Sequence, residues 1–207
     1  MPSQRHKSRL PRLPEPGSPE DAVLDAARDT VLAVGVRRTT MTEVARRAGV
    51  SRMTLYRRWP DVGTLVADLM TREWLQAVAA SEPPQLRTGP AMPGRDRLVA
   101  HVLAAGRAVR RHPLFRKIVE VDPDLLLPYL LRRRGTSQQV ILQLVADRLR
   151  DGQADGSIRD ADPALLARTV LLVAQALVLS GRTLADRGGV GALERQVATL
   201  LDRYLAP

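Results

Sequence analysis

The side chains best suited to specific chemistry lie in the stretch TMTEVARRAGVSRMTLYRRW, residues 40–59. Arginine can form two hydrogen bonds with O6 and N7 of guanine, and the methyl groups of Met and Thr fit against the methyl group of thymine. Thr and Tyr hydroxyls can reach phosphate oxygens. This combination suits double-stranded DNA. The residues that could supply it are Thr40, Thr42, Arg52, Met53, Thr54, Tyr56 and Arg57.

Two short helices must position these side chains. The first opens at Thr40, with Glu43 placed for a capping box, and Gly49 ends it. Ser51 caps the second helix two residues later. A tight turn needs a residue that tolerates positive φ, and Gly49 supplies it. The spacing therefore predicts a helix-turn-helix, whose apolar seam consists of Val44, Val50, Leu55 and Trp59.

The segment from Gly35 to Leu65 resembles the signature of the TetR family. Helical periodicity along the chain predicts an all-α fold of about nine helices. The resemblance implies that Thr40 and Tyr56 contact phosphates. One departure concerns the fourth helix, where the family often has a Lys-Glu pair and this chain has Val62 and Gly63. The matching residues are Thr40, Val44, Ala45, Ala48, Gly49, Val50, Ser51, Thr54, Leu55, Tyr56, Trp59 and Leu65.

Positive charge is concentrated in the same part of the chain. The net charge is +10, and residues 1–59 hold 12 Arg or Lys against 6 Asp or Glu. Residues 1–19 are rich in proline and predict a disordered basic arm. Two interpretations of this arm are open: it contacts phosphates or a minor groove, or it is a simple unstructured terminus. Residues 20–64 are predicted to form the DNA-binding domain.

Residues 65–207 are predicted to form a helical domain for effector binding and dimerisation. Apolar residues recur at helical spacing through it, and its last two helices carry more of them than one neighbour would cover. We expect these helices to form a homodimer interface, although closure of the monomer core is the alternative. The expected interface residues are Leu165, Thr169, Leu172, Val173, Ala176, Leu177, Val197, Leu201 and Tyr204.

The family resemblance also implies an effector cavity between the middle helices. Because these helices are mostly aliphatic, a small lipophilic effector is expected. The effector would favour a state in which the recognition helices of the dimer no longer match adjacent major grooves. We therefore expect a ligand-responsive homodimeric repressor, and its two-fold symmetry predicts a near-palindromic operator. The residues expected around the effector are Trp74, His101, Phe115, Leu126, Tyr129, Gln143 and Gln175.

Other classes of function have weaker support. The chain has no cysteine, and neither a signal-peptide pattern nor a membrane span is predicted, so we expect a cytoplasmic protein with no membrane partner. Asp151–Asp162 imitates a calcium loop poorly, because the expected final glutamate is missing, and no metal or cofactor is predicted. No nucleophile motif favours an enzyme. A nonspecific architectural DNA-binding protein is the main alternative.

Overall fold

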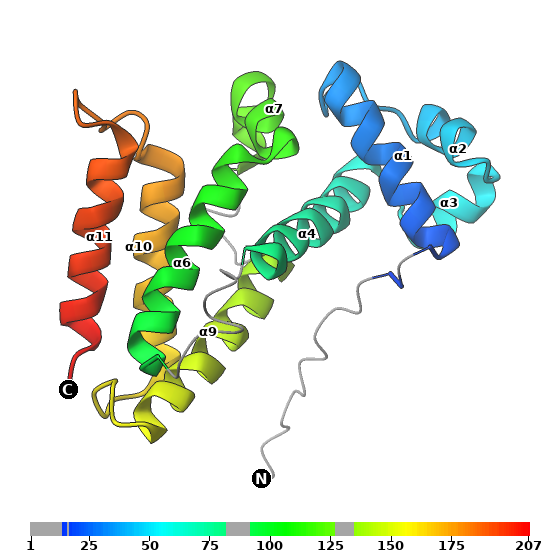
Figure 1. Cartoon of the computed structure of the whole chain (residues 1–207). Helices are drawn as coiled ribbons and strands as arrows, with labels where there is room; N and C mark the ends of the chain where they lie inside the picture. Colours follow the sequence, from blue (N-terminus) through cyan, green and yellow to red (C-terminus); the bar gives the residue numbers. More distant parts are fainter. Residues whose placement is uncertain (1–13, 16, 82–91, 127–134) are drawn as a thin grey trace, which may run out of the picture.

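A computed structural model describes residues 14–15, 17–81, 92–126 and 135–207. These residues form nine α-helices and one 3₁₀ helix, and the described part contains no strand. The predicted all-α fold with about nine helices is confirmed. Figure 1 shows the N-terminal helices standing apart from the C-terminal ones, with one long helix between the two groups.

The head of the molecule consists of α1 (Pro19–Val34), α2 (Met41–Ala48) and α3 (Arg52–Arg58), followed by the connecting helix α4 (Val62–Ala80). The side chains of Ser18, Thr40, Ser51 and Asp61 each accept a backbone hydrogen bond at a helix N-terminus. Gly35 ends α1 with φ 84°, and Gly49 ends α2 in the left-handed region with φ 66°. Thr40, Gly49 and Ser51 thus set the ends of α2 and the start of α3 as expected.

The body of the molecule begins after α4. It consists of α6 (Gly94–Arg111), α7 (Pro113–Val121), the 3₁₀ helix η1 (Pro123–Leu126), α9 (Thr136–Ala154), α10 (Pro163–Ser180) and α11 (Gly189–Leu205). Helices α6, α10 and α11 lie side by side, with α9 crossing toward α4 (Figure 1).

Two apolar clusters hold these parts together. The first joins the head to the body, because Leu24 of α1, Leu69 of α4 and Leu114 of α7 are all fully buried in it. The second lies within the body and includes the fully buried Leu149 and Leu201. The head is thus packed on the body through α4 and α7 and is not merely tethered to it.

Helices α6 and α9 meet at two glycines. A Cβ atom on Gly94 would lie 2.6 Å from the Cα atom of Gly152, so only glycine fits this contact. The Asp155 carboxylate accepts a 2.8 Å hydrogen bond from the Gly94 amide, and its pKa is lowered by hydrogen bonds from Ser157 and Gly94. This junction fixes the N-terminus of α6 against the C-terminus of α9.

Helix α10 is apolar but only partly buried. Its 18 residues have a mean hydropathy of 1.8, and by length and composition alone the helix could cross a membrane. Only 22% of these residues are buried in the protomer. Among its apolar side chains, Leu165 and Leu172 remain 56% and 68% exposed.

Candidate DNA interface and ligand pocket

The second helix of the predicted helix-turn-helix is held by its apolar side. Leu55 and Trp59 are 1% and 2% exposed and pack with Val44 beneath the turn, as the sequence predicted. The Trp59 indole donates a 2.9 Å hydrogen bond to Asp68 of α4. These contacts fix the rotation of α3 about its axis, so its remaining side chains must point outward.

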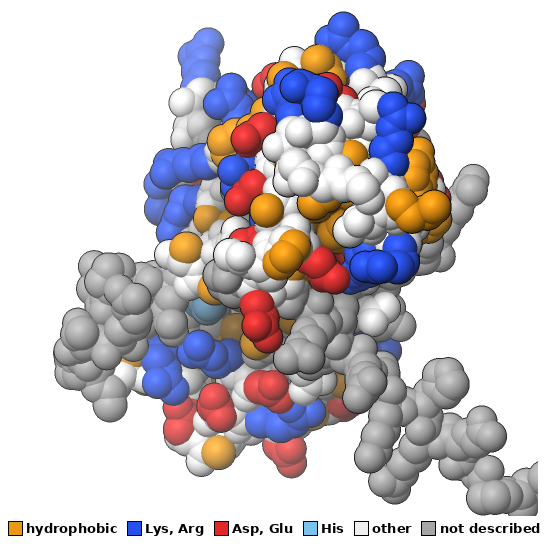
Figure 2. Space-filling model, turned by 90° about the vertical axis from the view of Figure 1, so that its right-hand side faces the viewer, with side chains coloured by type: hydrophobic (Ala, Val, Ile, Leu, Met, Phe, Trp, Pro, Cys, Tyr) orange, Lys and Arg blue, Asp and Glu red, His pale blue; other side chains and the backbone are white. Residues whose placement is uncertain are grey.

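The outward face of α3 carries the predicted DNA-contacting side chains. Met53 is 81% exposed and Tyr56 is 49% exposed, and Arg52 and Arg57 are exposed as well. Neither arginine forms a hydrogen bond or ion pair with another described residue. Figure 2 views the molecule from this side and shows Lys and Arg side chains over its upper half, with hydrophobic groups between them.

Arg58, on the same helix, behaves differently. Its guanidinium lies 3.5 Å from both Glu20 and Asp68 and stacks 5.2 Å from the Trp59 ring centroid. Arg58 therefore holds α3 against α1 and α4, whereas Arg52 and Arg57 remain available to a ligand.

The predicted threonine contacts have local roles too. The Thr40 hydroxyl accepts the Glu43 amide at 3.2 Å, and the hydroxyls of Ser51 and Thr54 lie 2.9 Å apart. Thr40, Thr42 and Thr54 are all exposed. The helix caps thus place exposed hydroxyl groups at the N-termini of both helices.

Only half of the predicted capping box forms. Instead of reaching back to Thr40, the Glu43 side chain accepts hydrogen bonds from Arg46 at 2.7 Å and from Arg47 at 2.6 Å. These hydrogen bonds lower the Glu43 pKa to about 2. Two arginines of α2 therefore share one carboxylate partner, in contrast to those of α3.

A buried ion cluster that the sequence analysis missed joins the head to α4. Arg72 is 3% exposed, and its guanidinium contacts Asp21 at 2.6 Å, Asp25 at 2.9 Å and Glu73 at 2.8 Å. Burial by itself lowers the Arg72 pKa, but the hydrogen bonds to Glu73 and Asp21 outweigh it and the pKa is raised. His112, between α6 and α7, lies 3.2 Å from Glu73.

A second contact connects the body to the loop that precedes the helix-turn-helix. Asp122, at the end of α7, is 1% exposed and accepts a 2.8 Å hydrogen bond from the Val36 amide. Arg37 lies 3.5 Å from Asp122 and 2.5 Å from Asp124. The head is thus anchored to α4 by the ion pairs of α1, and to the end of α7 by the hydrogen bond from the Val36 amide.

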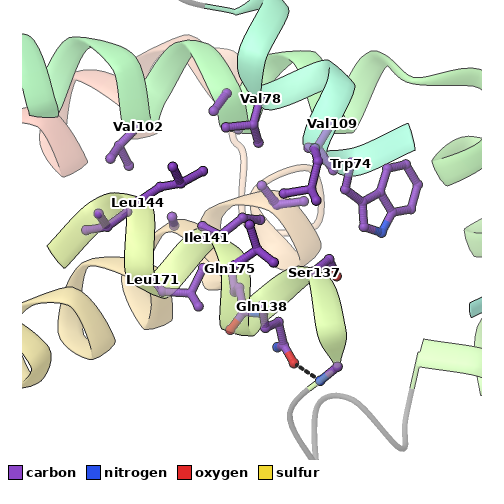
Figure 3. A pocket seen from close by; sticks show the side chains of 18 of the residues that line it. Trp74, Val78, Val102, Val109, Ser137, Gln138, Ile141, Leu144, Leu171 and Gln175 are labelled. Carbon is purple, nitrogen blue, oxygen red and sulfur yellow. Dashed lines mark hydrogen bonds between the residues drawn. The ribbon is translucent and has the colours of Figure 1, made fainter. Parts of the chain in front are cut away.

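A cavity of about 830 Å³ lies between α4, α6, α9 and α10. This volume is in the range of small-molecule sites. Apolar side chains make up most of its wall, including Val78, Val102 and Leu144, which face one another in Figure 3. Trp74 contributes one end of the wall and packs edge-on against Phe115, with the ring centroids 5.8 Å apart.

Most of the predicted effector residues line this cavity, namely Trp74, His101, Phe115, Leu126 and Gln175. The prediction for Gln143 is wrong, because Gln143 is exposed on the other face of α9 and hydrogen-bonds Asp147 there. Tyr129 lies outside the described residues. Arg148 was not among the predicted residues, and it is the only Arg, Lys, Asp or Glu of the described wall.

The predicted interface residues fall into two groups. Leu165, Leu172 and Ala176 are exposed, and Thr169, Val173, Val197 and Tyr204 are partly exposed. Leu177 and Leu201 are 7% and 0% exposed because they pack inside the protomer, so we remove them from the interface. The exposed Leu200 joins the first group.

Comparison with known proteins agrees with this arrangement. Residues 23–69 match the sequence model described as bacterial regulatory proteins, tetR family. Uncharacterized HTH-type transcriptional regulators of Mycobacterium bovis and Mycobacterium tuberculosis are each 36% identical over 185 residues, which cover 88% of this chain and 92% of theirs. The chain belongs to the TetR family. It is a helix-turn-helix transcriptional regulator.

Solved structures share the TetR-family fold. The transcriptional repressor QsdR of R. erythropolis superimposes with a TM-score of 0.65 at 16% identity, covering 88% of this chain and 94% of its own. The fatty acid degradation regulator FadR of Bacillus halodurans gives 0.59 at 17% identity, with 91% and 96% covered. At these identities the likeness establishes the fold alone.

Proposed function

We propose that this TetR-family regulator is a homodimeric repressor that binds a near-palindromic operator and releases it when a lipophilic effector occupies the body. In this proposal residues 20–64 form the DNA-binding domain and residues 65–207 the effector and dimerisation domain, in the cytoplasm. The observation that carries it is the outward face of α3, with two unpaired arginines beside exposed Met53 and Tyr56 among the described residues.

The proposed DNA contacts follow from that face. Arg52 and Arg57 are placed for guanine edges or phosphates in a major groove, and Met53 for a thymine methyl. The hydroxyl groups of Tyr56, Thr40, Thr42 and Thr54 are placed for the DNA backbone. Each unpaired cation releases counterions on meeting a phosphate, so binding weakens as salt rises. The basic residues of 1–13 lie outside the described part of the chain.

Exposed residues on α10 and α11 support the proposed dimer. On α10, Leu165, Thr169, Leu172 and Ala176 recur at intervals of four, three and four, which puts them on one face. Val197, Leu200 and Tyr204 repeat this spacing on α11, beside α10 in Figure 1. The Tyr204 hydroxyl donates a 3.2 Å hydrogen bond to Thr169, which aligns the two stripes. Pairing this face with its copy would cover the apolar surface of α10.

The connecting helix α4 supports the proposed link between effector and DNA. Trp74 lines the cavity, and the two residues that precede it, Arg72 and Glu73, form the buried ion cluster with α1. A ligand that displaces Trp74 would therefore shift the helix that carries the head. FadR of Bacillus subtilis, with a TM-score of 0.59 at 15% identity, was solved in complex with stearoyl-CoA, an acyl compound. The apolar wall of the present cavity also suits a lipophilic effector.

Selection of bound duplexes from a random DNA library tests this function, followed by titration of the winning duplex at two salt concentrations. We expect a near-palindrome to be enriched, and sedimentation to give a dimer. Arg57→Ala should lower affinity for that duplex by about 1–3 kcal/mol, because it removes a base or phosphate contact. Arg150→Ala makes the same charge change on the exposed side of α9 and should leave binding unchanged.

A Leu172→Glu variant tests the dimer in the same assay, because it puts a charge at the centre of the proposed stripe. It should sediment as a monomer and lose the palindrome. Binding with steep salt dependence and no preferred sequence would instead identify a nonspecific architectural protein. A wild-type monomer, or no DNA binding at all, would contradict the proposal directly.

A further inference from the structure

One polar side chain interrupts the apolar surface that α10 presents to the cavity. Leu171, Ala174, Gln175 and Val178 line the cavity from α10, at the spacing of residues that share one helix face. Gln175 is the polar member of this group, and every other residue from Val170 to Leu179 is apolar. The side chains beside it on the helix therefore cannot form hydrogen bonds with its amide.

The Gln175 amide has no partner in the part of the chain that the structure describes. It is partly buried and forms no hydrogen bond with another described residue. Two other polar groups of the wall are paired: the Thr71 hydroxyl donates to the Ala67 carbonyl at 2.8 Å, and His101 Nε2 lies 3.1 Å from the Val78 carbonyl oxygen. Gln175 thus keeps its NH₂ donors and its carbonyl acceptor for a ligand.

Gln175 also stands away from the ends of the cavity. The lining residues of α10 run from Val170 to Leu179, with Gln175 between them. Figure 3 shows its side chain in the wall together with those of Ile141 and Leu171, which are apolar. A ligand that fills the cavity therefore passes the amide partway along its length.

Contact with a ligand excludes water from this amide. A purely apolar ligand then leaves the amide donors and acceptor unpaired, which weakens binding. A carbonyl accepts a hydrogen bond from the NH₂ group, and a hydroxyl can accept from it or donate to the amide oxygen. Because the amide is neutral, it does not offset the desolvation of a charged group. The wall at Gln175 thus favours an uncharged oxygen group.

We propose that the cavity takes a neutral, largely apolar molecule whose carbonyl or hydroxyl group forms a hydrogen bond with the Gln175 amide. This inference rests on the proposed function, in that the cavity is taken as the effector site. It goes further by naming the polar group that the effector carries and by making Gln175 the residue that selects for it.

Equilibrium dialysis with two probes of the same carbon skeleton tests the assignment on the full-length protein. Benzophenone carries a carbonyl between its two rings, and diphenylmethane has a CH₂ group in that place. Gln175→Met replaces the amide by an apolar chain of similar length, so it should weaken benzophenone binding about threefold to tenfold. Diphenylmethane should bind Gln175→Met as tightly as wild type or more tightly, because no amide is left unpaired.

Gln143→Met is the matched control, because Gln143 is exposed on the other face of α9 and lies outside the cavity. It should change the binding of neither probe. Equal weakening of both probes in Gln175→Met, or an unchanged affinity for benzophenone, overturns the hydrogen bond to Gln175 and leaves an apolar effector cavity intact. Failure of both probes to bind wild type overturns the proposed ligand class, and operator binding measured without ligand remains a separate test of the DNA function.

Discussion

The arginines of α3 and α4 show what the same side chain does in different surroundings. On α3, Arg52 and Arg57 are exposed and pair with no other described residue. On α4, Arg72 is 3% exposed and is surrounded by the carboxylates of Asp21, Asp25 and Glu73. A buried cation is tolerated only when it is paired, whereas an exposed unpaired cation keeps its charge for a partner.

This difference in burial separates arginines that bind DNA from an arginine that stabilises the fold. The arginines of α3 should contribute to DNA affinity and little to folding, because a surface charge without a partner contributes almost nothing to stability. Arg72 should contribute to folding and to DNA affinity only through the position of the head. The predictions below test this separation, from the largest expected effect to the smallest.

Replacing the buried arginine should have the largest effect. Arg72→Met removes the cation that contacts three carboxylates, and the buried carboxylate of Glu73 loses its 2.8 Å contact and keeps only His112 at 3.2 Å and Arg28 at 4.0 Å among the described residues. We expect the free energy of unfolding to fall by about 3–5 kcal/mol. Urea unfolding followed by circular dichroism measures this loss.

Arg57→Met is the matched control, since it makes the same substitution on the exposed face. Its free energy of unfolding should stay within about 0.5 kcal/mol of wild type, while its operator affinity falls. Equal destabilisation by the two substitutions would show that burial does not distinguish these arginines. The separation of the two roles would then fail.

Asp122 gives an intermediate test, because its partner is a backbone amide and not a buried cation. Asp122→Ala leaves the Val36 amide without its 2.8 Å acceptor, and we expect a loss of about 1–3 kcal/mol in unfolding free energy. Asp122→Asn keeps an acceptor oxygen and should recover part of it. If the alanine variant is as stable as wild type, α7 does not anchor the head in the way that the structure suggests.

The sequence predicted the head well because its signals are local. The caps Thr40 and Ser51 and the terminator Gly49 each act within four residues of their own position, so spacing alone placed them. The exception is Glu43, for which two arginines on the next turn are better partners than the Thr40 amide.

The ion cluster around Arg72 and the cavity both depend on contacts between residues far apart in the chain, which the spacing of residues does not reveal. Arg72 is about fifty residues from Asp21, and arginine is rarely buried, so nothing in its neighbourhood marked it. Gln143 was predicted in the cavity because the rotation of α9 was unknown. Trp74 and Phe115 were predicted correctly, since large aromatic side chains between amphipathic helices tend to face the interior.

The smallest expected effect concerns the paired arginines of α2. Hydrogen bonds from Arg46 and Arg47 lower the Glu43 pKa to about 2, below its ordinary value of 4.5. A lowered carboxyl pKa adds stability above the unfolded value, and that stability is lost as pH falls from about 4.5 through about 2. Glu43→Gln should therefore make the decline in unfolding free energy over this window shallower.

Urea midpoints measured from pH 6 to pH 2 for wild type and Glu43→Gln would check this, with Glu120→Gln as the control on an exposed carboxylate whose arginine lies 3.9 Å away. The difference should be small, because the Glu43 ion pairs are exposed to solvent and screened by salt.

The same Glu43→Gln variant also tests the comparison between the arginines of α2 and α3, since it frees Arg46 and Arg47. If neutralisation by Glu43 is what distinguishes α2 from α3, binding of Glu43→Gln to DNA of unrelated sequence should strengthen and become more salt-dependent. An unchanged salt dependence would mean that these two arginines are too far from the phosphates to matter, and that position, not pairing, sets the difference.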